Sequence, residues 1–566
     1  MATAMPNILF IMTDQHRADH LGCYGNKILK TPNIDSIATN GVTFDRFYVA
    51  NSTCMPNRAT LITGRMPSNT GVLSNGQPLP VDSNTFVHIL RQGGYKTALF
   101  GKSHLQNGYP HGVEDWNYPA YPDGVAPPEG YRDSNLSLRQ GTEYDNERAD
   151  LWLSDPAREI TAPYYGFEEV RFANAHGDGV HGHYTAWARS QHPDFDSLIG
   201  PKNAVPAEHI VNPIAWKTRV PEELYSTTFV EQMTTKYLED NASSDKPFFI
   251  QCSFNDPHHP FTPPGSYWGR YDPDEVVLPS SHGAEHNAPP PLQTKLKEAH
   301  ARGERIDVRV EAHAVTERET LEAIALTYDM LTFVDDAVGR LLKRLSELGL
   351  AENTIIVFTS DHGDLMGDHG LMLKHCFHNE GTIRAPFIWA DPTTERKNTR
   401  TDMVGGTLDI AATILGRVGL QPYHGMQGQD VIGHLDKDTH PLRFGMVLEE
   451  DEIPFNANCD HFLRTRSFVT GTWRMTYWLE DNFGELYNRD EDPEEIHQMA
   501  ESNSHVVDQL RCLAIDAIDN KAGEAALHER TLRAFEYERR PQRRVYQFDR
   551  SRGVVGFPER PEDVLT

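Results

Sequence analysis

Four mostly apolar runs, each followed at once by polar residues, constrain the fold of this chain more than any other feature. The runs cover residues 8–13, 95–100, 247–254 and 354–360. Continuous apolar runs of this length are typical of strands buried on both faces of a parallel sheet. Helical periodicity runs through 321–348 up to Gly349. The sequence therefore predicts an α/β fold, a large and mostly parallel sheet sandwiched by helices.

Polar side chains follow each of these predicted strands. In chain order they are Asp14-Gln15, Lys102-Ser103-His104, Asn255-Asp256-Pro257-His258 and Asp361-His362. Parallel strands bring their carboxyl ends to one edge of a sheet, and ligands bind at that edge. We therefore expect these groups to lie together around a site.

The composition changes near residue 450 and predicts a second, smaller unit. We assign residues 1–450 to the main domain and 451–524 to a C-terminal α+β subdomain, in which TWRMTYWLED and GELYNRDEDPEE form a small antiparallel sheet before a helix at about 494–519. Residues 525–566 have no core of their own and are predicted to form an arm, which favours a homo-oligomer, either a dimer or a tetramer. Residues 103–225, rich in Pro, Gly, Tyr and His, are predicted to be long loops that set specificity.

Charge and cysteine content exclude several classes of protein. The formal net charge of −28 argues against nucleic acid and anionic membranes as partners. The six cysteines are scattered without a CxxC pair, unlike those of a disulfide scaffold or a zinc finger. The apolar run near the N-terminus is too short for a signal sequence or a membrane span. We therefore expect a cytoplasmic protein without a membrane partner.

The segment NSTCMPNRATLITGR holds the sharpest local motif. Thr53 can cap a helix whose first turn accepts Pro56 and which Gly64 can end. Cys54 then lies at a helix N-terminus, where free N–H groups favour anions, and Arg58 lies one turn further on the same face. On these residues alone Cys54 could also be an unmodified small residue beside a helix cap. A phosphatase thiolate fits less well, because it needs a wider, glycine-bearing loop between its Cys and its Arg.

The pattern C-x-P-x-R at Cys54, Pro56 and Arg58 resembles the motif that formylglycine-generating enzymes recognise in type I sulfatases and in the related phosphonate monoester hydrolases. Segments 63–65 (TGR), 360–363 (SDHG) and GELYNRDEDPEE are also similar to this family, so the resemblance extends from about residue 6 to about residue 500. It implies an alkaline-phosphatase-like fold and membership of the alkaline phosphatase superfamily. It also implies that a formylglycine-generating enzyme is a partner in maturation and makes formylglycine from Cys54.

The resemblance further implies one divalent metal ion. Its ligands would be formylglycine at Cys54 with Asp14, Gln15, Asp361 and His362. Two carboxylates, an amide oxygen and an imidazole form a mixed site that suits Ca²⁺, Mn²⁺ or Mg²⁺. Many sulfatases carry a carboxylate where Gln15 stands and an amide where His362 stands, so this pair is more similar to the phosphonate hydrolase branch.

A sulfate ester needs cations for its non-bridging oxygens and a proton donor for its leaving oxygen. By resemblance, Lys102 and His104 contact formylglycine, and His104 takes its proton when sulfate is expelled. His258 would act as general acid while Lys374 binds the sulfate oxygens. Asn75 matches a polar contact of the phosphonate hydrolase branch.

The resemblance implies an arylsulfatase-like hydrolase whose substrate is a small-molecule sulfate ester. We hypothesise that hydrated formylglycine attacks sulfur, that His258 protonates the departing alcohol or phenol, and that the aldehyde re-forms as sulfate leaves. The alternative is a phosphonate monoester or phosphodiester hydrolase using the same site, expected here as a promiscuous activity. Gln15 and His362 favour that branch, whereas Lys102 and His104 stand where it has uncharged residues.

Two further interpretations concern less specific features. The cluster HGDGVHGH, with His176, His181 and His183, could suggest a second metal but is predicted to be a glycine-rich, solvent-facing loop. Histidines 369, 375 and 378 are candidates for contacts behind the metal ligands. A non-catalytic protein on a decayed sulfatase fold would have lost a metal ligand or Arg58, and none of these is missing.

Overall fold

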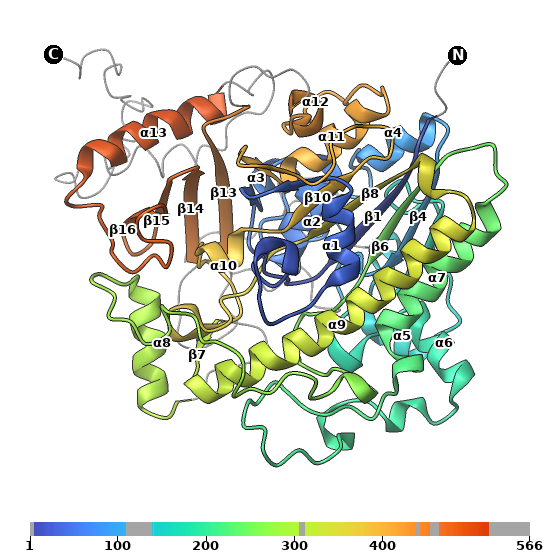
Figure 1. Cartoon of the computed structure of the whole chain (residues 1–566), viewed down its shortest axis with the longest axis horizontal. Helices are drawn as coiled ribbons and strands as arrows, with labels where there is room; N and C mark the ends of the chain where they lie inside the picture. Colours follow the sequence, from blue (N-terminus) through green and yellow to red (C-terminus); the bar gives the residue numbers. More distant parts are fainter. Residues whose placement is uncertain are drawn as a thin grey trace, which may run out of the picture.

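The computed structural model describes residues 5–108, 139, 141–304, 312–435, 442–452 and 463–519. An eight-stranded sheet forms its centre (Figure 1). From edge to edge the strands are β11 (Thr399–Thr401), β2 (Val42–Phe44), β10 (Phe387–Ala390), β8 (Thr354–Ser360), β1 (Asn7–Thr13), β6 (Phe248–Ser253), β4 (Lys96–Gly101) and β5 (Glu169–Phe172). Strand β10 runs antiparallel to its neighbours, and the other pairs are parallel. The four strands predicted from apolar runs are confirmed as β1, β4, β6 and β8.

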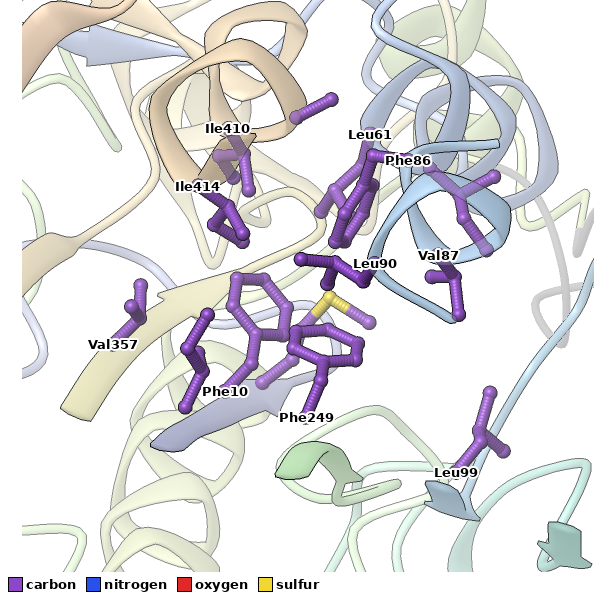
Figure 2. Packing of buried hydrophobic residues seen from close by; sticks show 14 of the residues in the cluster. Phe10, Leu61, Phe86, Val87, Leu90, Leu99, Phe249, Val357, Ile410 and Ile414 are labelled. Carbon is purple, nitrogen blue, oxygen red and sulfur yellow. The ribbon is translucent and has the colours of Figure 1, made fainter. Parts of the chain in front are cut away.

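The two faces of the sheet are covered by separate sets of helices. Phe10 of β1 packs on one face, in a buried cluster with Leu90 and Ile410 of the covering helices (Figure 2). Leu9, the next residue along the strand, packs into the cluster on the opposite face, as the alternation of a strand requires. The first face is covered by α2 (Cys54–Thr63), α4 (Phe86–Gln92), α11 (Ile410–Arg417) and α12 (Val431–Leu435). The second is covered by α1 (Pro32–Thr39), α6 (His183–Gln191), α7 (Ser226–Asn241) and α9 (Glu317–Glu347).

Helix α9 is the helix predicted from the periodicity of 321–348. It begins earlier than predicted because Thr316 accepts the N–H of Glu319, whose carboxylate in turn accepts the N–H of Thr316. The chain leaves the helix through Gly349, whose φ of 69° lies in the left-handed region that favours glycine. The helix crosses the sheet diagonally beside α7 (Figure 1).

A second, antiparallel sheet lies beside the main one (Figure 1). Its strands, in order, are β13 (Gly445–Glu452), β14 (Leu463–Thr470), β15 (Trp473–Trp478) and β16 (Phe483–Asn488). The predicted hairpin is confirmed as β15 and β16. The predicted boundary at 450 falls inside β13, which belongs as a whole to this sheet.

The helix after this sheet, α13 (Ser504–Asp519), begins later than the predicted 494. The Asp492 carboxylate accepts the N–H groups of Ile496 and His497, which holds that stretch in a turn. The predicted arm at 525–566 lies outside the described residues.

The prediction that 103–225 consists of long loops is wrong in part. This segment contains α5 (Ala149–Ser154), α6 and the sheet strand β5. The four residues of β5 are too short to stand out as an apolar run, and pairing with β4 makes them a strand. Residues 109–138 and 140 lie outside the described part of the chain.

Smaller elements complete the fold. They are the pairs β3 (Phe47–Tyr48) with β12 (Gly405–Gly406) and β7 (His313–Ala314) with β9 (Leu371–Met372), and the helices α3 (Pro67–Thr70), α8 (Pro291–Ala301) and α10 (Glu380–Ile383). Within the described ranges, no helix is both long and apolar enough to cross a membrane. Cysteines 23, 54, 252, 376 and 512 form no disulfide bond within these ranges, and Cys459 lies outside them.

Candidate active site

The strand ends meet as the sequence predicts. Thr13 of β1 lies in register with Ser360 of β8, so the residues that follow, Asp14 and Asp361, leave the sheet side by side. On the other side of β1, Met12 pairs with Ser253 of β6, and the chain after β6 leads to His258. Strand order alone therefore gathers side chains that are hundreds of residues apart.

Four groups converge at this edge. The ligand atoms of Asp14, Cys54, Asp361 and His362 all lie within 4.8 Å of one another, and the four residues are buried. Sγ of Cys54 is 3.0 Å from Nε2 of His362, and this nitrogen is 3.7 Å from a carboxylate oxygen of each aspartate. Two carboxylates, an imidazole and a sulfur atom thus surround one point.

Gln15, the fifth predicted ligand, lies next to this group. Its Oε1 accepts a hydrogen bond from Nζ of Lys374 at 2.6 Å, and the same Nζ is 3.4 Å from Sγ of Cys54. Its Nε2 donates to the Asp364 carboxylate and faces Nδ1 of His259. The amide oxygen is therefore the Gln15 atom that faces the centre.

Cys54 is the first residue of α2, as predicted, and Gly64 ends the helix in a left-handed conformation. Thr53 is the N-cap residue of this helix, as predicted, but its side chain makes no capping hydrogen bond. Its hydroxyl instead donates to Oε1 of Glu450 at 2.7 Å. Oδ1 of Asn75 accepts the N–H of Met55 at 3.1 Å, so Asn75, predicted as a polar contact of the site, caps α2.

Arg58 braces the carboxylates and makes no hydrogen bond to Cys54 among the described contacts. Its Nε donates to Oδ2 of Asp361 at 2.7 Å, and its Nη2 is 3.6 Å from Oδ2 of Asp14. Another guanidinium nitrogen donates to the carbonyl of Lys102 at 3.0 Å. Because Arg58 is buried, these contacts fix the positions of both carboxylates.

Two ammonium groups lie close to the cysteine. Nζ of Lys102 pairs with Oδ2 of Asp14, and Nζ of Lys374 lies 3.2 Å from Nε2 of His362. Burial alone would raise the pKa of Cys54, but the charges of Lys102, Lys374 and His362 outweigh burial and hold it well below its ordinary value. The centre of the site therefore favours negative charge at residue 54.

His104 and His258 come from different loops. The His104 backbone has φ of 58°, and its N–H donates to Glu147, whose carboxylate also accepts from Leu105 and Gln106. A hydrogen bond with the His104 side chain contributes to the low pKa of Cys54, which places His104 at the site. Nothing local in the sequence marked Glu147, because its role depends on a contact with a loop far away in the chain.

His258 points its Nε2 toward Nζ of Lys374, 3.0 Å away, while its Nδ1–H donates to the carbonyl of His259 at 2.5 Å. Burial lowers the pKa of His258 well below its ordinary value, and the neighbouring His176 and Lys374 lower it further. His258, which the sequence predicts as the general acid, therefore lies beside Lys374.

The prediction of a solvent-facing loop for HGDGVHGH is wrong. His176 lies against His258 with the ring centroids 3.4 Å apart, and the ring of His183 packs 4.6 Å from Trp152. His181 is buried as well. The sequence prediction failed because the glycines there permit close packing rather than exposure.

The histidines expected behind the metal ligands divide into two groups. Nδ1 of His375 lies 3.5 Å from the Thr53 hydroxyl, and Nε2 of His378 lies 3.0 Å from Oε2 of Glu450. Both therefore support the segment before Cys54. His369 instead pairs with Asn379, on the wall of a charged cavity of about 380 Å³.

A model of the sulfatase family matches residues 6–420 of this chain. The chain belongs to the sulfatase family. A second family description, that of the C-terminal part of N-sulphoglucosamine sulphohydrolase, matches residues 367–515 of this sulfatase. The protein is therefore a sulfuric ester hydrolase, as the motif at Cys54 predicts.

Individual relatives agree with this assignment. The sulfatase is 25% identical to an uncharacterized sulfatase of Escherichia coli, over 99% of this chain and 94% of the relative. It is also 25% identical to an arylsulfatase of Clostridium perfringens, over 91% of this chain and 95% of the relative. Among solved structures, a phosphonate monoester hydrolase of Agrobacterium radiobacter superposes with a TM-score of 0.68 at 22% identity, covering 90% of this chain and 96% of that one. This likeness confirms the alkaline-phosphatase-like fold.

Proposed function

We propose that this sulfatase hydrolyses small-molecule sulfate esters with a formylglycine made from Cys54 and one divalent metal ion. The observation that carries the proposal is the convergence of Asp14, Asp361 and His362 on Cys54. Hydrated formylglycine supplies an oxygen nucleophile that can later expel sulfate by re-forming the aldehyde. The motif around Cys54 makes a formylglycine-generating enzyme the partner in maturation.

The donor set fits a hard divalent cation. The carboxylates of Asp14 and Asp361, the amide oxygen of Gln15 and the imidazole of His362 would hold Ca²⁺, Mn²⁺ or Mg²⁺ together with residue 54. The ion supplies positive charge that favours ionisation of the nucleophile. Arg58 keeps the two carboxylates in place through its bond to Asp361 and its ion pair with Asp14.

The ammonium groups provide the anion site. Lys102 and Lys374 both act on residue 54, and their ammonium groups would bind the non-bridging oxygens of a sulfate ester there. Nε2 of His258 is directed toward the same space and would donate a proton to the leaving oxygen. Burial and the neighbouring His176 and Lys374 lower the pKa of this imidazole in the free protein, whereas a bound sulfate ester brings a negative charge that raises it. His104 would accept the proton from residue 54 when sulfate departs.

A phosphonate monoester or phosphodiester is the second candidate substrate, as a promiscuous activity. Gln15 and His362 favour it, and Gln15 is held by both Lys374 and Asp364. The cationic Lys102 and the nearby His104 favour sulfate esters as the principal substrates. The ratio of kcat/KM for an aryl sulfate and an aryl phosphonate measures this preference, and a ratio below one would reverse it.

Peptide mapping of active enzyme tests the nucleophile directly. Formylglycine replaces the mass of H₂S by that of oxygen in the peptide that contains residue 54. Metal analysis should find one divalent ion per chain, and chelation followed by addition of Ca²⁺, Mn²⁺ or Mg²⁺ should abolish and restore activity. Full activity with an unmodified thiol, or in the absence of any metal, would refute the proposal. The cytoplasmic location and the homo-oligomer stay predictions from the sequence.

A further inference from the structure

The loop after β5 packs closely against the loop after β6. Asn255 donates from Nδ2 to the carbonyls of Ala173 and Ala175 at 2.8 and 2.7 Å. Gly177 has φ of 56°, and a Cβ at this position would lie 2.6 Å from Cγ of Pro260. These hydrogen bonds and close contacts restrict movement of the two loops relative to each other. They therefore also restrict the positions of the side chains between the loops.

His176 and His258 are the side chains at this contact. Their rings are parallel, with an angle of 6° between the planes and 3.4 Å between the centroids. His259 covers His258 as well, at 4.2 Å and 28°. The terminal torsion of a histidine ring has a broad energy minimum, so a ring without such neighbours can rotate. The stack, together with the hydrogen bond from Nδ1 of His258 to the His259 carbonyl, therefore defines the plane in which Nε2 of His258 lies.

The edge of the His176 ring has a polar contact. Its Nε2 accepts a hydrogen bond from Nζ of Lys102 at 2.7 Å and lies 3.7 Å from Oδ2 of Asp14. Donor atoms of Asp14, His176 and His258 lie within 4.8 Å of one another, which is close enough for a cation. The Lys102 ammonium lies against Asp14 and His176, so the chain itself supplies the positive charge there.

We infer that His176 is a positioning residue that orients the general acid His258 through its ring and Lys102 through its Nε2. The inference rests on the proposed function, because it assigns His176 to the acid of that reaction. Small misplacements of a catalytic group reduce rates steeply, so the fixed plane matters for proton transfer to the leaving oxygen. Sequence reasoning placed this residue in solvent, whereas the structure places it between the acid and the anion site.

Three variants separate the two contacts. His176→Phe keeps a flat ring on His258 and loses the contact to Lys102. His176→Gln keeps an acceptor for Lys102 and loses the stack, and His176→Ala loses both. His183→Ala is the matched control, since His183 directly follows this loop as the first residue of α6 and packs on Trp152, with no contact to His258 among the described ones.

Aryl sulfates with different leaving groups provide the first readout. Phenyl sulfate depends on protonation of its leaving oxygen more than 4-nitrophenyl sulfate does. We expect His176→Ala and His176→Gln to lose about tenfold more kcat/KM on phenyl sulfate than on 4-nitrophenyl sulfate. His176→Phe should keep the wild-type ratio of the two substrates and show a raised KM on both. His183→Ala should lower Tm and change kcat/KM for both substrates by the same factor.

His258→Ala, measured in parallel, distinguishes the failure of this inference from the failure of the proposed function. One outcome is that the loss of kcat/KM depends on the leaving group in His258→Ala but not in His176→Ala. His176 then has no positioning role, and the proposed function stands. If His258→Ala reduces kcat/KM on both substrates by the same factor, His258 is not the general acid. The inference about His176 is then refuted as well.

A readout independent of activity is the ¹³C–¹H spectrum of the enzyme labelled at histidine. The stacked ring shifts the His258 ring protons upfield; His176→Ala and His176→Gln should move them downfield and His176→Phe should not. Unchanged His258 resonances in His176→Ala would overturn the inference. So would a second divalent ion per wild-type chain that is lost on replacement of His176, because His176 would then be a metal ligand.

Discussion

Glu450 joins the C-terminal sheet to the segment that precedes Cys54. It lies buried on β13, where Oε1 accepts from the Thr53 hydroxyl at 2.7 Å and Oε2 accepts from the Ser52 hydroxyl at 2.5 Å. Nε2 of His378 lies 3.0 Å from the same Oε2. Burial alone would raise the pKa of Glu450, but these hydrogen bonds and the charge of the neighbouring imidazoles lower it to about 2.

Replacement of Glu450 by Gln removes this charge while keeping the shape of the side chain. Each pKa unit corresponds to about 1.4 kcal/mol, so a fall from the ordinary value of 4.5 to about 2 stabilises the folded protein by about 3 kcal/mol at neutral pH. A depressed carboxyl pKa stabilises the fold above the pKa of the unfolded chain, and the stabilisation is lost as pH falls toward the folded value. The difference between wild type and Glu450→Gln should therefore shrink to about 1 kcal/mol near pH 3.

Urea unfolding followed by circular dichroism and tryptophan fluorescence measures this difference at each pH. The exposed Glu352, replaced by Gln, is the matched control and should change stability by less than about 0.5 kcal/mol. Because Glu450 holds Ser52 and Thr53, Glu450→Gln should also lower kcat. A loss of stability that is equal at neutral pH and near pH 3, or no larger than that of Glu352→Gln, would show that the charge of Glu450 does not stabilise this junction.

Three further predictions follow from the site. Cys54→Ser should turn over almost no aryl sulfate and should accumulate a sulfated chain in intact-mass spectra, because serine cannot expel sulfate by forming an aldehyde, whereas Cys252→Ser on β6 should remain active. Lys374→Ala should reduce kcat/KM for an aryl sulfate by about a hundredfold, since a buried cation at the anion site is lost; an unchanged value in steady-state assays would exclude that role. Gly177→Ala should destabilise the fold by about 1–3 kcal/mol in urea unfolding. Residue 177 has a left-handed backbone conformation, and the new Cβ would also lie too close to Pro260. A variant as stable as the wild type would contradict the close packing of the two loops.

The main sheet and the centre of the site could be predicted from the sequence for a local reason. The apolar run in β1 indicates a strand buried on both faces, and this pattern is complete within seven residues. Asp14 follows the strand directly. Because parallel strands share one edge, knowing where β1 and β8 end was enough to expect Asp14 and Asp361 together. The turn residues of α2 placed Cys54 at a helix start in the same way.

The tertiary structure alone decided what holds these groups in place. Thr53 and Glu450 are 397 positions apart, and neither carries a local pattern that reveals the other. The stack of His176 on His258 depends on how two loops meet after the sheet has formed. The sequence by itself therefore determined the strands, the helix that begins at Cys54 and the polar groups at the strand ends, because periodicity and turn chemistry act over a few residues. Only the fold decided which side chains orient them, because such contacts depend on packing between distant segments.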